Sequence, residues 1–197
     1  MKNVQSTVEH KHEQHGSLVT RLNGIEIEEW LANAPVGAPV YLVGIGGCGM
    51  SGLAHLLLDL GFTVFGSDLQ TNSAIRQLRE RGALTFEGHA PEQMRSARPT
   101  LIVYSSAIRL DNPEMALAEQ QEIPIVRRAV LLANLIRRRR GVCVAGMHGK
   151  TTTTAMLAQT LDALGAAPGY AVGAIVPQLG RPARMGDSAK RFFGVET

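Results

Sequence analysis

The sequence predicts an α/β fold, in which a doubly wound parallel-sheet domain is followed by the start of a second α/β domain. Three observations lead to this prediction. Short apolar runs without polar alternation recur along the chain, as in parallel strands that are covered on both faces. Segments with helical spacing separate these runs. Two glycine-rich turns, at residues 44–49 and 146–151, each follow such a run and precede such a segment.

The first domain is assigned to residues 39–140, where strand and helix patterns alternate. A short apolar strand, a glycine-rich turn and a helix open it as a βαβ unit. The predicted strands are 40–43, 63–68, 101–105 and 123–126, and the predicted helices are 50–60, 73–81, 113–121 and 127–138.

Residues 1–38 read as a polar extension that contains one short amphipathic helix at 24–33, ended by Pro35 and Pro39. Its three histidines, His10, His12 and His15, lack a metal-ligand spacing, so we interpret the start of the chain as a polar tail.

The second domain is assigned to residues 141–197, where the cycle of strand and helix starts again. The predicted order is a buried-type strand at 141–145, a helix at 151–164, and strands at 170–173 and 191–195. Gly165 is expected to stop the helix. Because a parallel sheet needs neighbouring strands and covering helices, we expect this domain to be incomplete and the chain to be part of a longer protein.

Composition narrows the class of protein. Of 197 residues, 45% are hydrophobic and 19% charged, which is typical of a globular chain with a core. The net charge is +3, and much of the excess lies in the run 137–140, where it suits a helix end, so nucleic acid is not indicated. No apolar stretch reaches the roughly 20 residues that span a bilayer. Cys48 and Cys143 have no disulfide or zinc spacing, so we expect buried or loop-packed thiols. The expected location is cytoplasmic, without membrane insertion.

The first glycine-rich turn reads Gly44-Ile45-Gly46-Gly47-Cys48-Gly49. Gly44 permits a tight backbone, Gly46 leaves room for a pyrophosphate, and Gly49 lets helix and strand pack closely. The N–H groups at the start of the helix then face the anion. Asp68, at the end of the second strand, stands where a carboxylate accepts hydrogen bonds from a ribose. The pattern predicts a Rossmann-like nucleotide diphosphate site, with a glycine-rich packing turn as the alternative.

The second turn reads Gly146-Met147-His148-Gly149-Lys150-Thr151 and contains the core of a phosphate-binding loop, or P-loop. Lys150 can reach terminal phosphates, and the Thr151 hydroxyl can bind magnesium at the amino terminus of a helix. The longer P-loop pattern has glycine where this chain has Val144, so the loop is a shortened variant. Two phosphate-binding turns indicate two phosphorylated ligands, and therefore a two-substrate enzyme.

Four segments in this order resemble the Mur ligase family: 43–52, 66–68, 104–108 and 145–154. The resemblance covers residues 40–197. His148 and the Gly-Met-Ser-Gly ending of the first turn favour the alanine-adding members. Cys48 and Met147 replace the alanine and threonine that we expect there, at positions where the change leaves the backbone amides undisturbed.

The resemblance implies an ATP-dependent ligase of peptidoglycan precursor synthesis, which joins L-alanine to the carboxylate of UDP-N-acetylmuramate through an acyl phosphate. The first domain would bind the sugar nucleotide, with the turn at its pyrophosphate and Asp68 at its ribose. The alternative for His89 is a surface-loop residue, and the alternative for Ser105 and Ser106 is a turn. The implied residues are Gly44, Gly46, Gly47, Cys48, Gly49, Met50, Ser67, Asp68, His89, Ser105 and Ser106.

The resemblance also implies ATP and Mg²⁺ in the second domain. His148, Lys150 and Thr151 are the implied catalytic residues; Lys150 would neutralise the transferring phosphoryl group, and Thr151 with Glu196 would hold the metal. A solvated chain end is the alternative for Glu196. The implied ATP-binding residues are Gly146, Met147, His148, Gly149, Lys150, Thr151 and Thr152. Since the family's third domain supplies further contacts to ATP and the amino acid, we expect this chain not to ligate alone.

Two other classes of function stay open at this point. A nicotinamide-dependent oxidoreductase would use the first turn and Asp68 but leave Lys150 without a role. A non-catalytic module that binds a UDP-sugar would explain a chain of 197 residues if that is its natural length. The oligomeric state is not predicted.

Overall fold

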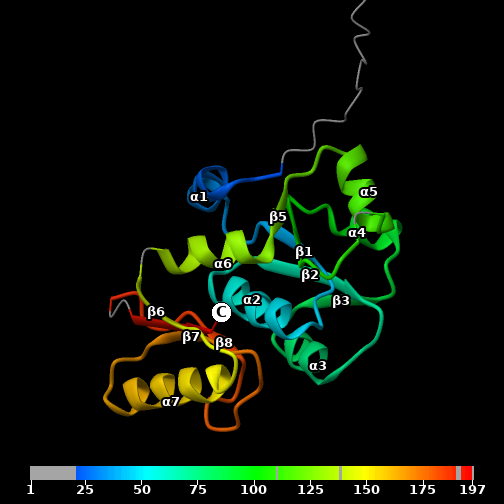
Figure 1. Cartoon of the computed structure of the whole chain (residues 1–197). Coiled ribbons are helices and arrows are strands. Elements are labelled where there is room, and N and C mark those ends of the chain that lie inside the picture. Colours follow the sequence, from blue (N-terminus) through cyan, green and yellow to red (C-terminus); the bar gives the residue numbers. More distant parts are fainter. Residues whose placement is uncertain (1–20, 110, 138, 190–191, 197) are drawn as a thin grey trace, which may run out of the picture.

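The computed structural model describes residues 21–109, 111–137, 139–189 and 192–196, and the polar tail predicted for the first residues lies outside them. The chain forms two sheets, and helix α2 (Cys48–Asp59) lies between them (Figure 1). The first sheet is parallel throughout, in the order β3-β2-β1-β4-β5. Its strands are β1 (Pro39–Val43), β2 (Thr63–Asp68), β3 (Leu84–Glu87), β4 (Leu101–Tyr104) and β5 (Ile125–Arg127). The predicted parallel α/β domain is confirmed.

Helices cover both faces of the first sheet, because alternate residues of its buried strands point to opposite sides. In β1, Val40 and Leu42 join one apolar cluster with α2, α3 and α6, whereas Tyr41 and Val43 join another with α4 and α5. The helices are α2 (Cys48–Asp59), α3 (Ser73–Glu80), α4 (Pro91–Ala97), α5 (Pro113–Gln120) and α6 (Arg128–Arg137).

The helix predicted at 24–33 is α1 (Gly24–Asn33), and it packs on α6. Its Ile27 is completely buried in the same cluster as α2. The backbone just before it also joins the fold, since the N–H of Leu22 donates to the carbonyl of Ile125 at 2.9 Å. Residues 21–33 are therefore part of the packed structure rather than a free extension.

The second sheet has four strands in the order β6-β9-β7-β8, with only the β7–β8 pair antiparallel. Helix α7 (Lys150–Ala163) lies on one of its sides (Figure 1), while α2 contacts β7 and β8. Its strands are β6 (Arg140–Val144), β7 (Gly169–Ala171), β8 (Ala183–Arg184) and β9 (Phe192–Glu196).

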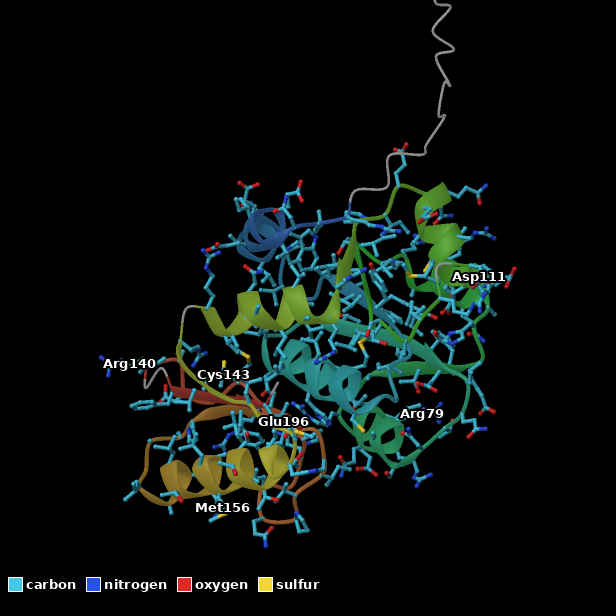
Figure 2. The ribbon with its side chains drawn as sticks, in the orientation of Figure 1. Arg79, Asp111, Arg140, Cys143, Met156 and Glu196 are labelled. Atoms are coloured by element: carbon cyan, nitrogen blue, oxygen red, sulfur yellow. The ribbon has the colours of Figure 1, made fainter. Side chains whose placement is uncertain are left out.

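The strand predicted as a buried type at 141–145 is an exposed one. It forms β6, an edge strand of its sheet, whose first four residues, including Cys143, are exposed. Figure 2 shows Arg140 and Cys143 at this outer strand. Cys48 is also exposed, so the expectation that both thiols are buried or packed in a loop is wrong. Within the described residues, no helix is both long and apolar enough to cross a membrane.

Candidate functional site

The first glycine-rich turn connects the carboxyl end of β1 to α2 and is held by the end of β2. Gly44 has φ +78°, a conformation that favours glycine, and its N–H and that of Ile45 donate to the Ser67 carbonyl at 2.8 and 2.9 Å. The N–H of Gly46 donates to Oδ2 of Asp68 at 2.8 Å. Asp68 therefore fixes the shape of the turn, and its predicted contact to a ribose remains a prediction.

Gly46 has no room for a side chain. A Cβ at this position would lie 2.9 Å from atoms of Asp68, Asn72 and Ile75. The Asn72 amide also donates to the Gly46 carbonyl at 3.0 Å. Both the amide and the carbonyl of Gly46 are therefore already bonded within the protein.

The amides that remain available belong to the first turn of α2. Gly47 is the N-cap residue, and because it is a glycine it has no side chain that could cap the helix. The N–H groups of Cys48, Gly49 and Met50 accordingly have no acceptor within the described part of the chain. Uncapped amides at the positive end of a helix form a binding site for an anion, and these three are the ones that we expect a pyrophosphate to contact.

The predicted serines lie in a turn beside Gly44. The Ser105 hydroxyl accepts a hydrogen bond from the N–H of Ala107 at 3.3 Å, and Ser106 is exposed. The side chain of Ile108 packs against Gly44, with its Cδ1 3.1 Å from where a Cβ would lie. The turn after β4 therefore borders the turn after β1, as expected at the shared carboxyl edge of parallel strands.

His89 belongs to a buried polar cluster that the sequence did not predict. The carboxylate of Glu114, fully buried at the start of α5, lies 2.9 Å from Nδ1 of His89. It accepts hydrogen bonds at 2.6 Å from the hydroxyls of Tyr41 and Ser67. Burial, and next the hydrogen bond to Glu114, raise the pKa of the Tyr41 hydroxyl well above its usual range. Glu114 follows Asn112 and Pro113, a helix-start pattern, so its sequence context indicated a capping carboxylate only.

The second glycine-rich turn precedes α7. Gly149 is the N-cap of this helix with φ +76°, and no side chain of the described residues caps the helix. The Nζ of Lys150 donates to the Gly146 carbonyl at 2.7 Å, which bends the lysine back over the turn. The side chains of Met147 and His148 are exposed, as is Thr152 of the first helical turn. The assignment of an ATP site and of catalytic roles to these residues remains a prediction.

Thr151 and Glu196 face the same glycine of the second domain. A Cβ at Gly173 would collide with the Glu196 carboxylate and would contact Oγ1 of Thr151. Oε2 of Glu196 is buried and has no hydrogen-bond partner among the described residues. A hydroxyl and an unpaired carboxylate oxygen beside a phosphate loop fit a hard cation such as Mg²⁺. No group of three or more His, Cys, Asp or Glu that could hold a metal occurs in the described ranges.

One cavity of about 260 Å³ connects the two glycine-rich turns. Cys48 and Gly49 border it from the first domain, and Lys150 and Glu196 from the second. Figure 2 shows Glu196 in this region, between α2 and α7. A second cavity of about 290 Å³ extends from Gly46 and Cys48 toward residues 173–175.

Arg128 is the functional candidate at this cavity that sequence analysis missed. It is the first residue of α6, lines the cavity, and places its Nη1 2.8 Å from where a Cβ on Gly49 would lie. Within the described residues no carboxylate pairs with this guanidinium. An arginine in a basic helix carries no signal in sequence, because only the fold brings it to the glycine-rich turn.

Over the aligned region, curated relatives are identical to this chain at about half of the positions. UDP-N-acetylmuramate–L-alanine ligase of Methylobacterium nodulans is 50% identical over 149 residues, or 76% of this chain. The protein of the same name from Janthinobacterium sp. (strain Marseille) is 49% identical over 147 residues, or 75% of this chain. The chain spans about a third (31%) of the length of these relatives.

Solved structures match at the level of the fold and of the sequence. UDP-N-acetylmuramate–alanine ligase from Thermotoga maritima gives a TM-score of 0.74 at 30% identity, covering 80% of this chain and 36% of that one. UDP-N-acetylmuramate:L-alanyl-gamma-D-glutamyl-meso-diaminopimelate ligase from Neisseria meningitides also gives 0.74, at 28% identity, covering 81% and 52%. The two names share the sugar nucleotide and differ in the second component.

The sequence model described as "Mur ligase family, catalytic domain" matches residues 39–140, which is more than half of the chain. This range contains β1 to β5 and the first glycine-rich turn, whereas the second glycine-rich turn lies beyond it. The chain belongs to the Mur ligase family.

Proposed function

We propose that this chain provides the sugar-nucleotide site and the phosphate loop of an ATP-dependent ligase that joins L-alanine to the carboxylate of UDP-N-acetylmuramate. The observation that carries the proposal is the cavity of about 260 Å³ that both glycine-rich turns border. A cavity between two uncapped helix starts suits a reaction in which one phosphorylated ligand modifies another. The names of the relatives support the two substrates, and the cytoplasmic location stays a prediction from composition.

The sugar nucleotide is proposed to bind at the carboxyl edge of the first sheet. Its pyrophosphate would lie at the amides of Cys48, Gly49 and Met50, because the other amides of this turn are bonded within the protein. The muramoyl carboxylate would then extend into the cavity lined by Arg128, whose guanidinium has no carboxylate partner in the described part of the chain. Both solved structures named above carry UDP-N-acetylmuramate in their names, which supports the same ligand here.

ATP is proposed to bind at the second turn. Transfer of its terminal phosphoryl group to a carboxylate oxygen would give ADP and an acyl phosphate, and the alanine amine would attack the carbonyl carbon and expel phosphate. Lys150 would neutralise the charge of the transferring group. Thr151 and Glu196 would hold Mg²⁺, which when bound supplies positive charge at the phosphate oxygens.

Calorimetric titration of the chain with UDP-N-acetylmuramate tests the first site, with UDP-glucose and NADH as comparison ligands. We expect selective binding of the muramic acid nucleotide, weakened about 10-fold or more by Asp68→Ala, since the Gly46 amide loses its acceptor. Asp111→Ala is the matched control, because this carboxylate is exposed and pairs only with Arg109 among described residues. Binding of NADH in place of the sugar nucleotide would return the first turn to redox chemistry.

Lys150→Ala tests the division into two sites. We expect the variant to lose ATP binding and to keep its affinity for UDP-N-acetylmuramate within about twofold, because Lys150 bonds only to its own turn in the described structure. Arg140→Ala removes a cation from the exposed edge of the same sheet and controls for net charge. An equal loss of both ligands would contradict the proposal of separate sites.

A further inference from the structure

In the polar cluster around Glu114, two hydroxyls and one imidazole nitrogen surround a single buried carboxylate. Glu114 is 0% exposed, and a buried carboxylate is stable only if donors surround it. Tyr41 donates to Oε1, and Ser67 donates to Oε2, each at 2.6 Å. A hydroxyl has one hydrogen, so Ser67 has none left for the imidazole, which lies 2.9 Å from the Ser67 oxygen.

The ring of His89 therefore has to supply its own hydrogen. Its Nδ1 lies 2.9 Å from both Oε2 of Glu114 and the Ser67 oxygen, and both of these atoms can accept. If Nδ1 carried no hydrogen, its lone pair would point at a lone pair of the Glu114 carboxylate oxygen, and this contact is unfavourable. The carboxylate thus keeps the hydrogen on Nδ1, as an oriented carboxylate does for other functional histidines.

The other ring nitrogen is left for a ligand. Nε2 of His89 has no hydrogen-bond partner within the described ranges, and the side chain is 13% exposed. The cluster is joined to the glycine-rich turn through Ser67, whose carbonyl accepts the amides of Gly44 and Ile45. His89 thus belongs to the same sheet edge as the proposed nucleotide site.

We propose that Tyr41, Ser67 and Glu114 form a device that fixes His89 with its hydrogen on Nδ1, so that Nε2 accepts a hydrogen bond from an N–H or O–H group of the bound nucleotide. The inference rests on the proposed sugar-nucleotide site. In a uridine nucleotide, the groups of this chemistry are the imide N–H of the base and the hydroxyls of the ribose, whereas the ionised pyrophosphate offers no donor. Glu114 and Tyr41 act as positioning residues and His89 as the contact.

The tautomer is measured without any ligand. Protonated and unprotonated imidazole nitrogens have well-separated ¹⁵N chemical shifts, and the His89 signal is identified by its loss in His89→Asn. We expect the hydrogen on Nδ1 in the unchanged chain, and a shift toward the Nε2-protonated form in Glu114→Gln, because a neutral amide is a weaker acceptor than a carboxylate. A hydrogen on Nε2 in the unchanged chain, or the same spectrum in both proteins, would overturn the proposal.

Binding then identifies the donor. Titration with UDP, with its N3-methyl derivative, with 2′-deoxy-UDP and with 3′-deoxy-UDP compares ligands in which one donor at a time is removed. We expect one of the three modified ligands to bind about 10-fold more weakly, and His89→Asn to abolish that difference. Tyr41→Phe, which removes one donor to Glu114 and keeps the ring, is the milder variant and should weaken UDP binding less than His89→Asn.

Two outcomes separate this inference from the proposed function. If UDP-N-acetylmuramate binds and neither Glu114→Gln nor His89→Asn changes its affinity, the inference is overturned and the proposed function stands. If no uridine nucleotide binds the unchanged chain, the proposed function fails, and the donor assignment for His89 fails with it. Thermal midpoints of the variants, together with ¹⁵N shifts of other residues, verify that each variant is folded.

Discussion

His55 is a buried, titratable residue of α2. Its side chain is 1% exposed, its Nδ1 accepts a hydrogen bond from Arg81 at 2.8 Å, and its Nε2 is buried without a partner in the described structure. Burial, and next the positive charges of Arg81 and Arg181, lower its pKa from 6.5 to about 4, although Asp59 nearby opposes this change. The folded protein therefore holds this ring neutral in mildly acidic solution.

The pKa of His55 predicts a pH-dependent stability. Between pH 6.5 and 4 the unfolded chain binds a proton that the folded chain does not, so the free energy of unfolding falls as the pH falls through this window. The slope is at most about 1.4 kcal/mol per pH unit. Urea unfolding at several pH values measures it, and His55→Gln should flatten the profile between pH 6.5 and 4. Identical slopes in both proteins would show that other groups carry the effect.

At the scale of elements, α1 shows how a short helix is fixed at both its start and its face. Oδ1 of Asn23 accepts from the amides of Ile25 and Glu26 at 2.8 and 3.2 Å, and the Glu26 carboxylate accepts from the Asn23 amide at 2.7 Å. This reciprocal pair is a capping box. On the buried side, Trp30 stacks on Phe62 with ring centroids 5.5 Å apart.

Removal of the cap of α1 is expected to weaken the packing between α1 and α6. Asn23→Ala should lower the free energy of unfolding by about 1 kcal/mol, because two amides of the first helical turn lose their acceptor. Asn33→Ala is the matched control at the other end of the helix, where the side chain bonds only to an exposed carbonyl in the described structure. Trp30 is the single tryptophan of the chain, so its fluorescence follows this region in urea. Equal effects of both substitutions would argue against the capping box.

Elements with a strong local pattern could be predicted from the sequence, and elements that depend on their neighbours could not. The strand at 63–68 and the helix at 24–33 were predicted with the bounds that the structure has, because apolar runs and helical spacing mark them. β3 was missed, since it is an edge strand without a continuous apolar run. The seven-residue α4 and the two-residue β8 were missed because segments this short do not show a recognisable hydrophobic period.

The same distinction applies to the candidate site. The glycines of both turns and Asp68 could be found from sequence because their roles follow from spacing along the chain. Tyr41, Glu114 and Arg128 could not, because each acts through a residue that is distant in sequence: Glu114 meets Ser67 and His89, and Arg128 meets Gly49. Only the folded structure brings these residues close to each other, at one edge of the first sheet.

At the scale of the whole molecule, Asp59 joins the two sheets. It lies at the carboxyl end of α2 and is 14% exposed. Its carboxylate accepts hydrogen bonds from Arg81 at 2.7 Å, from Arg181 at 3.0 and 3.2 Å, and from the amide of Met185 at 2.9 Å. Because Arg81 caps the end of α3 and residues 181–185 surround β8, this one carboxylate connects the first domain to the second sheet, beside the packing of α2 on β7 and β8.

A double-mutant cycle on Asp59 and Arg181 measures this connection. We expect Asp59→Asn to lower the free energy of unfolding by about 2 kcal/mol, since it leaves two partly buried guanidinium groups without a charged partner. Arg181→Met should cost less in the Asp59→Asn background than alone, with a coupling of about 1 kcal/mol. The cycle on Arg109 and Asp111, an exposed ion pair, is the control and should show no measurable coupling.

Ligand binding tests whether Asp59 also determines the shape of the cavity. If this residue fixes the cavity between the turns, Asp59→Asn should leave UDP affinity unchanged while weakening UDP-N-acetylmuramate, whose acidic sugar is proposed to extend toward Arg128 and the second domain. The difference arises because UDP would contact the first sheet alone. Equal affinities of the variant and the unchanged chain for both ligands would show that the sugar nucleotide is bound by the first domain only, and that the contact between the sheets serves stability alone.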